Sequence, residues 1–154
     1  MIQKILRTTF LGFSLLYLHS AAAEPRVGDM VILEGARIKT LQEITGYSED
    51  TALFTLRQTQ IVDGRSEEKE VQVAKDDLLT EEAALEIVKE CEAQSIGKFE
   101  KLKVSAGTFE TCRVSSGSGS TLWISAVPFG VVMLETPFHG DSVRLKLTSY
   151  RRGK

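Results

Sequence analysis

The sequence predicts a mainly β domain, a curved antiparallel sheet or half-barrel of about eight or nine strands with one packed helix. Three observations predict this class. Short runs of alternating apolar and polar residues fill the chain after Val27, glycine-containing turn sequences separate them, and one segment changes to helical spacing. Residues 24–154 are long enough for a single domain with an apolar core.

The first half of the domain has the pattern of an antiparallel meander. Ala52, Phe54 and Leu56 alternate with Leu53, Thr55 and Arg57, as expected when one face of a strand is better buried than the other. Asp63-Gly64 predicts a tight hairpin, because both central residues of such a turn need positive φ. The strand-like runs are "GDMVILEGA", "IKTLQEITGY", "TALFTLRQTQIV" and "EEKEVQVA".

One segment, "KDDLLTEEAALEIVKECEAQ", predicts a helix over Thr80–Ala93. Glu81 and Glu82 suit its first turn, where a carboxylate meets the positive end of the helix dipole. Gly97 marks the exit from this segment, where a helix end favours positive φ. Spacings of three and four place one apolar stripe on the helix, made of Ala84, Leu85, Val88 and Cys91.

After Gly97 the chain returns to strand patterns. Ala106-Gly107, the run from Ser116 to Ser120, Pro128-Phe129-Gly130 and His139-Gly140-Asp141 are the expected turns between them. The expected strands are "FEKLKVS", "TFETCRVSS", "STLWISA", "GVVMLETPF" and "SVRLKLTSY".

Residues 1–23 have the pattern of a secretory signal peptide. A basic start with Lys4 and Arg7 precedes an apolar stretch and the small-residue sequence Ala21-Ala22-Ala23. The uncharged run from residue 8 to residue 23 is shorter than the ~20 residues of a membrane-spanning helix. No cysteine follows closely enough for lipid attachment. We therefore expect a periplasmic or secreted protein without a transmembrane span, cleaved before Glu24.

Charge argues against a nucleic-acid partner. Without residues 1–23 the chain has 17 Lys and Arg residues against 21 Asp and Glu, a net charge of −4, whereas nucleic-acid binding depends on clustered cations that neutralise phosphates. The basic sequence "RRGK", residues 151–154, is best interpreted as a solvated chain end.

Cys91 and Cys112 are predicted to form a structural disulfide. Their separation of 21 positions is too long for a redox dithiol motif, and two Cys with one His are too few for a zinc site. An oxidising compartment and an even number of cysteines suffice for a disulfide. A nucleophilic cysteine with His139 as its base is the weaker alternative, and no metal or other cofactor is expected.

The segment "CEAQSIGKFEKLKVSAGTFETCRV", with "LWISAVPFGVVMLET" and "RLKLTSY", resembles small, mostly uncharacterised secreted or periplasmic β-proteins of Gram-negative bacteria. It is distantly similar to envelope proteins with the half-barrel of lipoprotein carriers. The resemblance covers roughly residues 91–150 and implies a curved antiparallel sheet. A lipoprotein carrier would have more than the single helix predicted here.

These patterns favour a non-enzymatic binding module. We expect its concave face to hold a lipid-like, apolar small molecule or a partner segment, against residues such as Phe109, Trp123 and Val132. An envelope adaptor that pairs through a sheet edge is the second hypothesis. A hydrolase-like enzyme is the third, because neither a Gly-x-Ser-x-Gly elbow nor a phosphate-binding loop occurs in the sequence.

Overall fold

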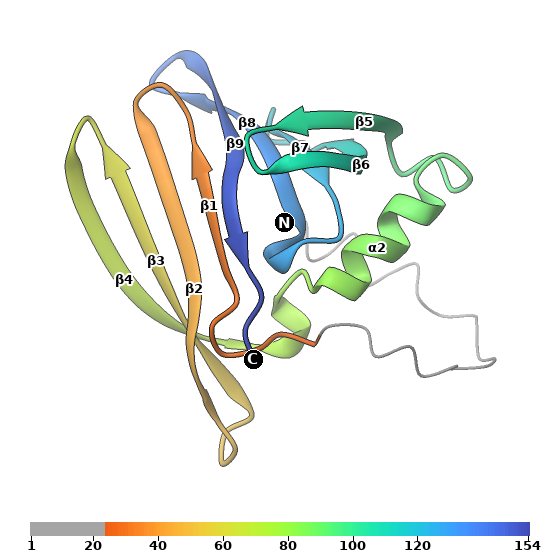
Figure 1. Ribbon diagram of the computed structural model, residues 1–154. Coiled ribbons are helices and arrows are strands. Elements are labelled where there is room, and N and C mark those ends of the chain that lie inside the picture. Colours follow the sequence, from red (N-terminus) through yellow and green to blue (C-terminus); the bar gives the residue numbers. More distant parts are fainter. Residues whose placement is uncertain (1–23) are drawn as a thin grey trace.

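The computed structural model describes residues 24–154, which form one antiparallel sheet of nine strands with a short helix packed on it (Figure 1). The sheet is not closed. Its strand order is β4-β3-β2-β1-β9-β8-β7-β6-β5, so β4 and β5 are the two edges. This confirms the predicted fold class. The predicted signal peptide lies outside the described residues.

The N-terminal half is a regular meander, which we call the wall. Each strand pairs with the next one in sequence, and the Asp63-Gly64 turn has the predicted positive φ angles of 49° and 79°. The wall consists of β1 (Met30–Glu34), β2 (Ile38–Ser48), β3 (Leu53–Val62) and β4 (Arg65–Ala74).

The wall leads through a 3-10 turn, η1 (Lys75–Asp77), into helix α2 (Glu81–Glu90). Thr80 is the N-cap, and its hydroxyl accepts a hydrogen bond from the backbone N–H of Ala83 at 3.1 Å. The predicted helix is therefore confirmed, although it ends three residues before Ala93. Ser95, with φ of 53°, takes the left-handed conformation that was expected at Gly97.

Gly97 is required for a different reason. A Cβ atom at this position would lie 2.3 Å from the carbonyl oxygen of Arg113 and 3.0 Å from the Cys112 sulfur. The glycine therefore lets the chain pass directly against β6 beside the disulfide.

The C-terminal half curls more strongly than the wall. The β5–β6 hairpin lies across the top of the molecule in Figure 1. At its tip, the backbone N–H of Ala106 donates to the carbonyl of Leu147 in β9 at 3.3 Å. This half consists of β5 (Lys98–Val104), β6 (Gly107–Ser115), β7 (Thr121–Ile124), the 3-10 turn η2 (Pro128–Gly130), β8 (Val131–Phe138) and β9 (Asp141–Arg151).

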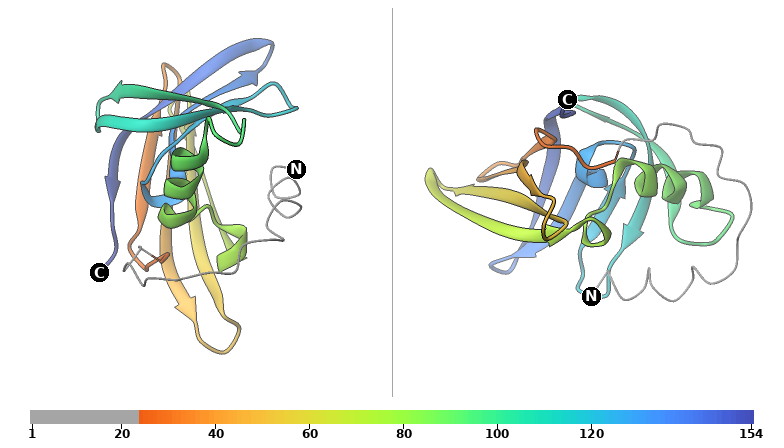
Figure 2. Two further views of the ribbon diagram at one scale, coloured as in Figure 1. Left: turned by 90° about the vertical axis from the view of Figure 1, so that its right-hand side faces the viewer. Right: turned by 90° about the horizontal axis from the view of Figure 1, so that it is seen from below.

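Buried side chains form three apolar clusters. The largest joins β1, β8 and β9 to the β5–β6 hairpin, and Val132 and Leu147 in it are 0% exposed. The second lies on the wall around Ile44, Phe54 and Leu56. The third holds α2 on the sheet through Val88 and the disulfide. Figure 2 shows α2 on one side of the sheet, which we call the inner face.

Phe129 in η2 connects the first two clusters. Its ring packs against both of them, and its φ of 60° is unusual for a bulky residue. Gly130 follows with φ of 70° and lies directly under Leu79 and Ala84, where a Cβ atom would lie 2.5 Å from the nearest carbon of Leu79. The tight "PFG" turn therefore seats the start of α2 on the inner face.

Candidate functional site

The disulfide between Cys91 and Cys112 is formed, as predicted. Their Cα atoms lie 5.6 Å apart, and both residues are buried beside Val88. The bond joins the end of α2 to β6. It is consistent with an extracytoplasmic protein, because disulfides persist in oxidising compartments. Neither in length nor in apolarity does any helix of residues 24–154 suit a membrane span.

Phe109, Trp123 and Val132, the residues expected to bind a ligand, do not share one open surface. Val132 is fully buried in the largest cluster, and Phe109 packs against that cluster with its ring edge-on to Tyr150, the ring centroids 6.2 Å apart. Trp123 is 6% exposed and belongs to none of the three clusters. Its indole N–H donates to the carboxylate of Glu100. The expected burial of Trp123 is thus confirmed, and Phe109 is half-buried.

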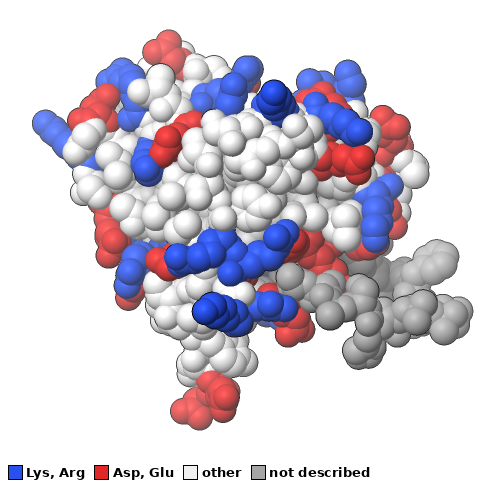
Figure 3. Space-filling model, viewed as in Figure 1, with Lys and Arg blue, Asp and Glu red and all other residues white. Residues whose placement is uncertain are grey.

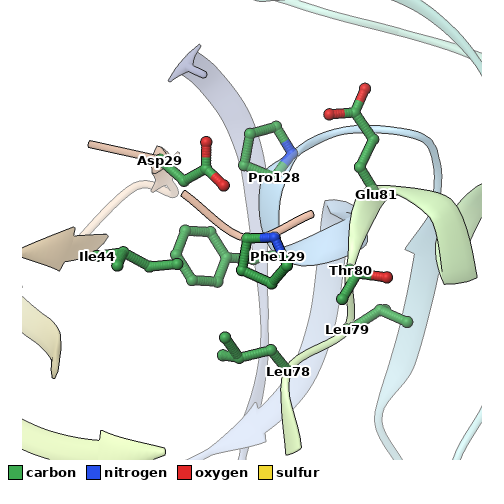
Figure 4. A pocket seen from close by; sticks show the side chains of 9 residues that line it. Asp29, Ile44, Leu78, Leu79, Thr80, Glu81, Pro128 and Phe129 are labelled. Atoms are coloured by element: carbon green, nitrogen blue, oxygen red, sulfur yellow. The ribbon is translucent and has the colours of Figure 1, made fainter. Parts of the chain in front are cut away.

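A small pocket lies where η2 meets the start of α2 (Figure 4). Its volume is about 10 Å³, which is roughly the space needed for one water molecule. The lining residues are Pro25, Asp29, Ile44, Leu78, Leu79, Thr80, Glu81, Pro128 and Phe129. Asp29 is the buried carboxylate among them, and it accepts hydrogen bonds from the backbone N–H groups of Arg26 and Gly153. The pocket is therefore part of the packing between the two chain ends and α2.

The inner face of the wall offers a larger candidate site. Side chains alternate along a strand, so residues two apart from buried Ile44 and Leu56 share their face. Those positions carry polar side chains in two cross-strand rows. One row is Gln42, Gln58 and Lys69, and the next is Thr40, Gln60 and Glu67. We call these six residues the amide panel. Below it lies the second apolar cluster, and above it lie Ile38 and Val62.

The amides of this panel are available for a ligand. No hydrogen bond joins the side chains of Gln42, Gln58 or Gln60 to any other residue in the described part of the chain. Gln42 and Gln58 are half-buried, whereas Gln60 is exposed. A groove of about 620 Å³ adjoins the panel at the β3–β4 turn, lined by Gln60, Val62, Asp63, Arg65, Ser66 and Glu67. Gln60 is the amide that lines this groove, and it can both donate and accept hydrogen bonds.

Strand β4 borders the panel as an edge strand. It pairs with β3 along all ten residues from Arg65 to Ala74, and its other side has no partner strand within the described sheet. Residues 65–70 are exposed and mostly charged. The backbone groups on that free side can accept an added strand.

The outer face of the wall has a different character. Ion pairs cover it, including Arg57 with Glu70 at 3.2 Å and Lys39 with Glu34 at 2.6 Å. At the top of the wall, Arg37 binds Asp63 through two hydrogen bonds of 2.7 and 2.6 Å, and these lower the pKa of the Asp63 carboxyl. Cations and anions neutralise one another on this face, so it offers fewer unpaired groups than the inner face.

His139 lies in the turn between β8 and β9, with φ of 50° and its ring 4.3 Å from that of Phe138. The disulfide uses both cysteines, so the proposed pair of a nucleophilic cysteine and His139 is not formed. Within residues 24–154, no three His, Cys, Asp or Glu side chains are arranged to hold a metal ion.

Reasoning from the sequence missed the amide panel. The signal was present in "IKTLQEI" and "LFTLRQTQIV". In these strands, positions two and four residues from Ile44 and Leu56, on the same face, carry Thr or Gln. Recognising it requires the strand register, because polar residues on alternate positions otherwise indicate only a solvated face.

Comparisons of the chain with protein-family models, with curated proteins and with solved structures return no match.

Proposed function

We propose that the protein is a non-enzymatic binding module of the periplasm or the extracellular space, which holds an extended polar segment of a partner protein. The segment lies on the amide panel and pairs with the free edge of β4. The proposal combines the two leading hypotheses from the sequence, which are binding on the concave face and pairing through a sheet edge.

The observation that carries the proposal is the set of three amides, two half-buried and one exposed, that form no hydrogen bond to another residue in the described part of the chain. Polar groups that a partner covers must find hydrogen-bond partners, or binding is penalised by the cost of removing them from water. Gln42, Gln58 and Gln60 can each offer both a donor and an acceptor to a peptide or to polar side chains. Gln42 and Gln58 lie opposite each other across β2 and β3, and Gln60 lies two residues further along β3, so the three amides share one face of the sheet.

The edge of β4 supplies the second part of the recognition. A strand added there forms main-chain hydrogen bonds that do not depend on sequence, and its alternate side chains lie on the same face as the panel, next to Glu67 and Lys69 of β4. The charges of Glu67, Glu68 and Lys69 disfavour indiscriminate addition of apolar strands. They select for a segment with complementary charges.

The packing favours such a segment over a lipid. Val132 and Leu147, at the centre of the largest cluster, are already fully buried against protein atoms. An acyl chain would have to displace them, whereas a polar segment needs no rearrangement of the core. The three glutamine amides are not general acids or bases near neutral pH, which favours a binding role for them.

Selection from a random peptide display library against the purified protein tests the proposal. We expect the selected peptides to lose binding to a Gln58→Leu, Gln60→Leu variant. The matched control is Thr59→Val, on the outer face between the two glutamines, which should keep the affinity. Peptides methylated at alternate backbone nitrogens should also lose binding if they pair with β4.

Two results would overturn this function. Selected peptides that bind the Gln58→Leu, Gln60→Leu variant as tightly as the parent would exclude the panel. Native mass spectrometry that finds an apolar small molecule bound to the purified protein would instead support the lipid-binding hypothesis.

A further inference from the structure

Two exposed surfaces of opposite charge lie at the lower end of the sheet, away from the amide panel. The first is the end of the β2–β3 hairpin, residues 47–52, which we call the acidic prong. It projects below the rest of the molecule in Figure 1, and its tip is acidic in Figure 3. Glu49 and Asp50 are exposed there and form no ion pair within residues 24–154.

The acidic prong also presents an aromatic ring. Tyr47 is 49% exposed and lies against Phe54, with ring centroids 4.7 Å apart. The Ser48 hydroxyl accepts a hydrogen bond from the Thr51 backbone N–H at 3.4 Å, and this closes the turn. An exposed, supported tyrosine beside two carboxylates is typical of a contact surface, because a rigid ring loses little conformational entropy on binding.

The second surface is formed where the segment after residue 24 meets the C-terminal residues, and we call it the basic corner. It consists of Arg26, Val27, Arg151, Arg152 and Lys154. The buried Asp29 holds the two ends together, since its carboxylate accepts hydrogen bonds from the N–H groups of Arg26 and Gly153 at 2.9 and 2.8 Å. The predicted solvated tail is thus anchored. Lys154, its last residue, contacts no acidic group among residues 24–154.

Two of the four cations in the basic corner are neutralised within the chain. Arg151 binds Glu43 at 2.8 Å, and Arg152 binds Glu81 at 2.5 Å. Arg26 and Lys154 have no ion pair in the described part of the chain. Val27 beside them is 46% exposed. The basic corner therefore offers two cations and one apolar side chain, and the acidic prong offers two carboxylates and one aromatic ring.

We propose that the acidic prong of one copy binds the basic corner of a second copy, and that the contact is repeated in the other direction around a two-fold axis. A two-fold dimer needs a self-complementary surface, on which each residue of one copy meets its complement on the other. Both complements occur on this chain at the same end of the sheet, where Figure 3 shows Lys and Arg residues above the acidic tip. Tyr47 of each copy packs on Val27 of the other.

The amide panel lies toward the opposite ends of β2 and β3, so this dimer leaves it open. The inference is therefore independent of the proposed function. Because the free charges are exposed, salt should weaken the dimer, since charges are screened over about 10 Å at 0.1 M ionic strength.

A charge-swap experiment tests the dimer by sedimentation velocity at low and high salt. Variant one is Glu49→Lys, Asp50→Lys, and variant two is Arg26→Glu, Lys154→Glu. Each should dissociate at least about tenfold more readily than the parent, which corresponds to 1.4 kcal/mol. Mixing the two variants should restore a 1:1 dimer, because the positive prong of the first meets the negative corner of the second and the reverse contact is also attractive.

The matched control is Glu92→Lys, Glu110→Lys, which changes the net charge as variant one does at two exposed positions elsewhere. It should dimerise like the parent. Tyr47→Ala should weaken the dimer without unfolding the chain, as circular dichroism can verify. A parent that stays monomeric at every concentration, or a mixture of variants one and two that forms no heterodimer, would overturn the proposal.

Discussion

The two halves of the sheet differ in how much of their inner face is buried. In the C-terminal half, the β5–β6 hairpin reaches β9, and α2, η2 and the disulfide cover the inner face. In the wall, α2 and η2 cover only the end near Ile44 and Leu56. Val31, Leu33 and Ile38 of the wall join the largest cluster, and the polar amide panel occupies the inner face between these two apolar regions and β4. The same antiparallel meander thus yields one half with a covered, apolar inner face and one half with a partly polar inner face, where we propose that a partner binds.

This difference predicts where mutations are costly. The C-terminal half should contribute most of the stability, because its buried side chains have no room to relax. The wall should tolerate substitution at exposed and polar positions, with consequences for binding more than for folding.

The largest effect is expected for Trp123→Ala in the C-terminal half. The side chain is 6% exposed and donates to Glu100, so truncation removes apolar contacts and leaves a carboxylate without its donor. We expect a loss of about 3 to 5 kcal/mol in the free energy of unfolding, measured with denaturant. Trp123→Phe, which keeps most of the ring contacts, is the control and should lose less. If Trp123→Ala melted within a degree or two of the parent, the C-terminal half would not be the stable one.

The disulfide gives the next effect. A Cys91→Ala, Cys112→Ala variant should lose roughly 2 to 5 kcal/mol of the free energy of unfolding. The bond restricts the conformations of the unfolded chain, so folding of the variant loses more conformational entropy. Thiol titration of the unfolded, unreduced protein should detect no free thiol. Peptide binding by the folded fraction of this variant should persist, because the amide panel is in the wall. Lost binding in folded protein would mean that the two halves are coupled.

The fold could be predicted from the sequence because local signals agreed. Alternation, the Asp63-Gly64 turn and the helical stripe ending at Cys91 each specify structure over a few residues. The candidate site could not be predicted because it depends on register. Gln42 and Gln58 lie 16 positions apart in sequence and face one another only through the β2–β3 ladder. The role of Phe109, Trp123 and Val132 was assigned from size, which predicts burial well but does not show whether a ligand can reach them.

A matched pair of glycine substitutions compares the halves directly. Gly130 and Gly64 have similar φ angles, 70° and 79°, so alanine is strained at both by roughly 1 to 2 kcal/mol. At Gly64 a Cβ atom meets nothing within 4 Å, whereas at Gly130 it lies 2.5 Å from Leu79. Gly130→Ala should therefore cost about 1 to 3 kcal/mol more than Gly64→Ala in urea unfolding. Equal losses of stability would mean that Leu79, at the start of α2, can move away from the added methyl group without a measurable cost.

The smallest effect is expected at the ion pair above the wall. Hydrogen bonds from Arg37 lower the pKa of Asp63 in the folded protein, relative to about 3.9 in the unfolded chain. The pair therefore stabilises the fold above that value, and its contribution disappears as pH falls through the lower, folded pKa. Both side chains are exposed, so the contribution is small.

Asp63→Asn is the suitable test because asparagine also tolerates the left-handed conformation of this turn, where φ is 49°. We expect the variant to be slightly less stable than the parent at about pH 7, and the difference to shrink as the pH falls through the lowered pKa of the folded Asp63 carboxyl. Arg37→Gln should reproduce this pH dependence. The Arg37→Gln, Asp63→Asn double variant should be no less stable than either single variant. A difference in stability that stays constant from neutral to acidic pH would instead assign the effect to the turn. The stability of the wall would then depend on the backbone conformation of the Asp63-Gly64 turn more than on the charge of Asp63.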